Sequence, residues 1–68
     1  MWAIYDHPPE APAHIVLRRW EIDDDGQPRP REGTLHATLK EARAAVPLGL
    51  VRVAGGKDDA LKLVETYI

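Results

Sequence analysis

The 68-residue chain contains no cysteine, no phenylalanine and no apolar run of the ~20 residues that a membrane-spanning helix needs. The lack of cysteine excludes disulfide frameworks, thiolate metal sites and a cysteine nucleophile. Its first nine residues, MWAIYDHPP, lack the basic region and apolar core of a signal peptide. We therefore expect a soluble cytoplasmic protein with no membrane partner.

A strong excess of either charge is also absent. Nine basic and eleven acidic residues give a formal net charge of −2, so the chain as a whole has no long-range attraction for a phosphate backbone. A chain of this length forms one domain, residues 1–68, and folding buries only about 60% of its extended surface. Because such a core is small, a partner protein or a second copy (a homodimer) is an expected source of additional stability.

Four segments have the composition of strands. Residues 2–6 are aromatic and β-branched and end before a proline pair, which cannot donate to a ladder. Residues 14–22, HIVLRRWEI, form the longest strand candidate. In residues 48–55, Leu48, Leu50 and Arg52 alternate with Val51 and Val53, and residues 61–68 form a final strand segment.

The segment between the second and third predicted strands divides into a loop and a helix. Residues 23–34, DDDGQPRPREGT, contain turn residues and no apolar side chain, which predicts a flexible loop. The next apolar residues recur at helical spacing, Thr38 and Glu41 form a capping-box pattern, and Pro47 ends the pattern, so we expect a helix over Thr38–Val46. The predicted fold is α+β, with order β-β-α-β-β: a four-stranded, mainly antiparallel sheet with one short helix packed on one face.

The second predicted strand is apolar on both faces. Ile15 and Leu17 lie on one face, and Val16, Trp20 and Ile22 lie on the other. One nine-residue helix cannot cover both faces of a four-stranded sheet, so we expect an uncovered sheet face or an edge strand that binds a protein partner. The leading hypothesis is a non-catalytic protein-interaction module, with candidate interaction residues Ile15, Leu17, Arg18, Arg19 and Trp20.

A nucleic-acid-binding module is the alternative. Basic side chains with one aromatic residue are the pattern of a single-strand binder, in which arginines contact phosphates and a ring stacks on a base. Against this hypothesis, the acidic residues 23–25 and Glu32 lie beside the basic loop and reduce its positive field. The residues that would carry this function are Arg18, Arg19, Arg29, Arg31 and Trp20.

Candidates for catalysis and metal binding are weak. Asp6 and His7 are adjacent, but neighbouring strand residues point to opposite faces, so we expect no pairing if the strand extends through both. His14 and His36 complete the histidines, none at metalloprotease spacing. Three consecutive aspartates, residues 23–25, are typical of an acidic turn rather than a calcium loop. We therefore expect no enzyme, no metal and no cofactor, and the sequence leaves open whether Asp6, His7 and His14 converge.

Several longer segments carry a resemblance to a known family. IYDHPPEAP, followed by RRW, TLKEARAAVPLGLVRV and a final VETYI, resembles a family of small uncharacterised bacterial proteins of similar length. This similarity covers nearly the whole chain except DDDGQPRPREG. The resemblance implies a bacterial origin and an α+β fold, but no activity, cofactor or site residue. The chain departs from the family where Leu48 replaces a second proline.

Overall fold

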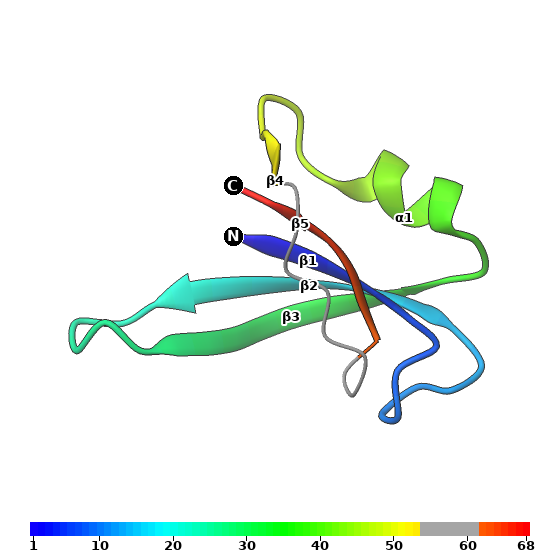
Figure 1. Cartoon of the computed structure of the whole chain (residues 1–68), viewed down its shortest axis with the longest axis horizontal. Helices are drawn as coiled ribbons and strands as arrows, with labels where there is room; N and C mark the ends of the chain where they lie inside the picture. The colour runs from blue at the N-terminus through cyan, green and yellow to red at the C-terminus, as the bar shows by residue number, and fades with distance from the viewer. Residues whose placement is uncertain (54–61) are drawn as a thin grey trace.

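The computed structural model describes residues 1–53 and 62–68, which form an α+β fold of five strands and one helix (Figure 1). The sheet order is β3-β2-β1-β5-β4, and every neighbouring pair of strands is antiparallel. The described elements are β1 (Trp2–Asp6), β2 (Ile15–Ile22), β3 (Pro28–His36), α1 (Leu39–Ala45), β4 (Arg52–Val53) and β5 (Leu63–Tyr67).

Strand β3 corrects the predicted loop at 23–34 and the predicted count of four strands. The loop ends at Gln27, and Pro28–His36 form an edge strand that pairs with β2. All but the last residue of β3 are exposed, so the strand has none of the apolar alternation that marks a half-buried strand. Its prolines, Pro28 and Pro30, are tolerated because an edge strand has only one hydrogen-bonded neighbour.

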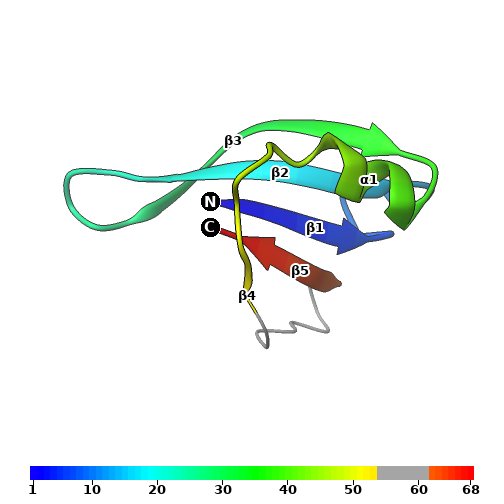
Figure 2. The same ribbon diagram turned by 90° about the horizontal axis from the view of Figure 1, so that it is seen from above.

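Helix α1 confirms the predicted helix and its N-terminal cap. The backbone amide of Glu41 donates to the Thr38 hydroxyl at 3.1 Å, as in a capping box. The Glu41 carboxylate accepts from the amide of Ala37 at 3.1 Å, one residue before the cap. Figure 2 shows α1 lying across one face of the sheet, where it contacts β1, β2 and β3.

The strand predicted at 48–55 is shorter in the structure. Residues 48 and 49 form a turn, β4 comprises only Arg52–Val53, and residues 54 and 55 lie outside the described part of the chain. Gly49 has a φ of 90°, which places this turn in the left-handed region that glycine adopts readily. The last predicted strand is confirmed over Leu63–Tyr67, and it pairs with β1 as an interior strand rather than an edge.

Buried side chains lie on both faces of the sheet. On the helix side, Ile4, Ile15 and Leu17 pack with Ala42 of α1. On the opposite face a second cluster joins residues of β1 and β2, and half-buried side chains pack against it. Its buried members are Ala3, Tyr5 and Val16, and the half-buried ones are Ala11, Trp20 and Leu63.

Candidate functional site

The five predicted interaction residues lie on different faces. Ile15 and Leu17 are buried beneath α1, with 6% and 1% of their surface exposed, so the expectation that they contact a partner is corrected: they form the core. Arg18 and Trp20 lie on the face opposite the helix. Arg19 pairs with Trp2 in the ladder and therefore lies on the helix side, where it forms an ion pair with Glu32.

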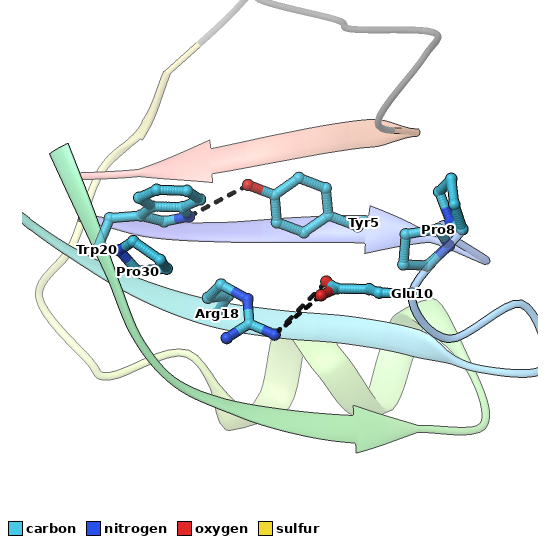
Figure 3. Close-up of a pocket in the computed structure, with 7 residues that line it drawn as sticks. Tyr5, Pro8, Glu10, Arg18, Trp20 and Pro30 are labelled. Atoms are coloured by element: carbon cyan, nitrogen blue, oxygen red, sulfur yellow. Dashed lines mark hydrogen bonds and ion pairs between the residues drawn. The ribbon is translucent and has the colours of Figure 1, made fainter.

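A groove of about 400 Å³ is present on the face opposite α1. This volume lies within the range of about 300–1,000 Å³ that is typical of ligand sites. Figure 3 shows aromatic and proline rings along it, with one ion pair at its side. The lining residues are Tyr5, Pro8, Pro9, Glu10, Arg18, Trp20 and Pro30.

Two aromatic side chains form the floor of the groove. The indole Nε1–H of Trp20 on β2 donates to the hydroxyl of Tyr5 on β1 at 3.1 Å (Figure 3). Ala3 lies on this same face of β1, next to Arg18 in the ladder, and is 97% buried. Since Ala3 has only a methyl group, the two rings lie along the sheet between β1 and β2 without a side chain separating them.

The connection between β1 and β2 forms one wall. Its ends are joined by the backbone bond from the His7 amide to the His14 carbonyl, at 3.0 Å. Two turns follow inside it, from the Ala11 amide to the Pro8 carbonyl at 2.9 Å and from the His14 amide to the Ala11 carbonyl at 3.1 Å. These bonds fold the connection back onto the sheet, bury Pro8 and place Glu10 opposite Arg18.

The Arg18–Glu10 pair lies at the side of the groove. The Nη2 group of Arg18 is 3.3 and 3.4 Å from the two Glu10 carboxylate oxygens, and its Nη1 donates to the carbonyl of Arg31 at 3.0 Å. The guanidinium lies directly over Gly33 of β3, where an added Cβ would be 3.2 Å from the Arg18 Cζ. Glycine at position 33 therefore gives Arg18 the space in which it lies.

The four arginines of the nucleic-acid hypothesis are all paired with the chain's own carboxylates. The hydrogen bonds that Arg19 donates to the carboxylates of Glu32 and Glu21 raise its pKa, and the bond donated by Arg29 lowers the pKa of Asp23 in the β2–β3 turn. Because each positive charge faces a negative one, this surface gives the nucleic-acid hypothesis no added support. The pairs are Arg18–Glu10 at 3.3 Å, Arg19–Glu32 at 2.7 Å, Arg29–Asp23 at 2.7 Å and Arg31–Glu21 at 3.0 Å.

Asp6 and His7 pair, because the strand does not extend through both residues, which was the condition for expecting no pairing. Strand β1 ends at Asp6, and His7 has a φ of 51°, so its ring turns back and Nδ1 contacts the Asp6 carboxylate. Both side chains are more than half exposed. His14 meets His7 through the backbone only, and no three metal-ligating side chains converge among residues 1–53 and 62–68.

A buried carboxylate lies on the helix side of the sheet. Glu65 of β5 is 93% buried and accepts from the Nε of Arg43 on α1 at 2.8 Å, and from the hydroxyl of Tyr67. The Arg43 bond holds the pKa of Glu65 below its ordinary value, while burial raises the pKa of Tyr67. Among the described residues no buried side-chain polar atom lacks a partner. This cluster therefore joins α1 to β5 and presents no open position to a ligand.

Comparison with models of protein families, with curated proteins and with solved structures finds no match. No helix in the described part of the chain is long and apolar enough to span a bilayer.

Proposed function

We propose that the protein is a non-catalytic interaction module that binds an extended segment of a partner protein in the groove opposite α1. The single observation that carries this proposal is the groove itself: about 400 Å³, floored by Trp20 and Tyr5. Aromatic side chains in a concave site are the usual anchors of a protein interface. The groove also lies on the sheet face that the only described helix does not cover.

The partner is a segment rather than a flat surface because the binding site is a small groove of about 400 Å³. In Figure 3, Pro8 of the β1–β2 connection and Pro30 of strand β3 lie at opposite ends of the groove, with the rings of Trp20 and Tyr5 between them. A partner side chain that enters the groove contacts these rings, which contribute large apolar contact areas at a low cost in conformational entropy. A broad protein surface would reach only the rims.

A display library of random twelve-residue peptides tests this proposal. Peptides selected on the wild-type protein should bind Trp20→Leu at least about 10-fold more weakly, because this residue is the central anchor. Trp2→Leu, the same replacement on the helix side of the sheet, should retain their affinity within about 2-fold, and circular dichroism should show that both variants are folded. Selection of no peptide, or equal loss in the two variants, would contradict the proposal.

A further inference from the structure

We infer that the segment accepted by the groove contains proline in a polyproline II conformation, with a lysine or arginine next to the proline. This inference rests on the proposed function and names the chemistry of the partner. It follows from three features of the groove: its position in the sheet, its rings and its exposed charge.

The position in the sheet excludes a β-strand ligand at this site. The floor residues Tyr5 and Trp20 belong to β1 and β2, and each of these strands already has a hydrogen-bonded neighbour on both sides. A segment that lies over these strands finds no free backbone donors or acceptors in them. Its own backbone N–H and C=O groups must therefore form hydrogen bonds with water. A polyproline II segment has no internal hydrogen bonds and a solvated backbone, and proline has no amide hydrogen to lose. A segment in this conformation therefore loses the fewest backbone hydrogen bonds when it binds over a sheet whose strands are already paired.

The rings of the groove suit proline side chains. In Figure 3 the chain's own Pro30 lies next to the indole of Trp20, and the two residues are partners in the β2–β3 ladder. The molecule thus already places a proline ring beside this indole. The indole N–H is engaged with Tyr5, so the floor offers ring packing rather than a hydrogen bond. Aromatic grooves bind proline-rich segments through such packing because polyproline II is already ordered before binding.

The accessible charge of the groove is negative. The Glu10 side chain is 52% exposed, whereas that of Arg18 is only 24% exposed. Their contacts of 3.3 and 3.4 Å exceed the roughly 2.7–2.9 Å of strong charge-assisted bonds. The carboxylate therefore retains the capacity to accept from a second cation, and Arg18 keeps its bond to the Arg31 carbonyl when this happens. A basic ligand residue is favoured, and an acidic one meets repulsion at Glu10.

Fluorescence anisotropy with three labelled ten-residue peptides tests this inference. The first peptide is proline with arginine at every third position, the second has glutamate in place of each arginine, and the third has alanine in place of each proline. The first should bind with a Kd of about 10–200 μM, as expected for a contact well below the size of stable interfaces. The second and third should each bind at least about 10-fold more weakly.

Two protein variants test whether the preference for the arginine peptide over the glutamate peptide comes from the groove. Glu10→Gln should weaken the binding of the first peptide by about 5-fold, because the exposed carboxylate is removed. The difference in affinity between the first peptide and the glutamate peptide should also become smaller. Asp24→Asn, the same loss of charge in the β2–β3 turn, should leave the affinity unchanged. An equal affinity for all three peptides, or no binding below 1 mM (about five times the upper end of the expected range of Kd), would overturn the inference.

The outcomes separate this inference from the proposed function. If library peptides bind through Trp20 but the proline–arginine peptide does not, the groove is the binding site and the partner chemistry is wrong. If neither binds, both proposals fail. If the protein dimerises in sedimentation experiments and Trp20→Leu prevents this, the groove holds a second copy and the inference is overturned.

Discussion

Replacing Leu17 by alanine is expected to lower the free energy of unfolding by about 3 kcal/mol, within the range of about 2–5 kcal/mol for buried leucines. Leu17 is 1% exposed and packs with Ile4 and Ala42 beneath α1. A domain of this length has a total stability of roughly 3–10 kcal/mol. The substitution therefore removes a large share of it, and urea denaturation followed by circular dichroism measures the change.

Leu35→Ala is the matched control for this prediction. Leu35 lies on the neighbouring strand β3 but is 58% exposed, so its loss should change stability by no more than about 0.5 kcal/mol. If Leu17→Ala leaves too little folded protein to measure, Ile15→Val should still cost about 0.5–1.5 kcal/mol. Equal effects at positions 17 and 35 would contradict the burial of this face of β2.

Glu65→Gln is expected to destabilise the fold by about 1–3 kcal/mol at pH 7, because the buried side chain at position 65 loses its charge-assisted bond with Arg43. The pKa of Glu65 is lower in the folded protein than in the unfolded chain, mainly because of Arg43. The carboxylate therefore contributes stability above its unfolded pKa, near 4.5, and this contribution is lost as the pH falls through the folded pKa.

The pH dependence distinguishes this role from simple packing. Urea midpoints at pH 7 and pH 3 should differ less in Glu65→Gln than in the wild type, since the variant has no carboxylate to protonate at position 65. Asp24→Asn, in the exposed β2–β3 turn, should keep nearly the full wild-type difference. A Glu65→Gln protein with an unchanged pH dependence would show that the carboxylate is not an ionised partner of Arg43.

The elements that the sequence predicted well are those with local signals. The helix over Leu39–Ala45 follows from apolar spacing and a cap at Thr38, and β1 follows from an apolar run ended by prolines. Strand β3 was missed because an exposed edge strand needs no apolar side chains. It is held by pairing with β2, a contact distant in sequence that no local pattern records.

The candidate site was predictable only in part. Alternation along β2 correctly placed Trp20 on the face opposite Ile15 and Leu17, but the sequence also suggested that Ile15 and Leu17 were available to a partner. The sequence pattern does not show which face of the sheet the helix covers, because this depends on the direction in which the chain turns after β3. Glu10 was missed because its position depends on the turns between β1 and β2. A signal was present in the prolines at positions 8 and 9, which stiffen that connection.

The two tryptophans provide the most direct test of the groove as the binding site. Trp2 lies on the helix side of the sheet and Trp20 lies in the groove, and their indole N–H groups give two separate signals in a proton–nitrogen correlation spectrum. On addition of a bound peptide, the account predicts that the Trp20 indole signal shifts while the Trp2 indole signal stays in place. A shift of the Trp2 signal alone, or of neither signal when the peptide is bound, would contradict it.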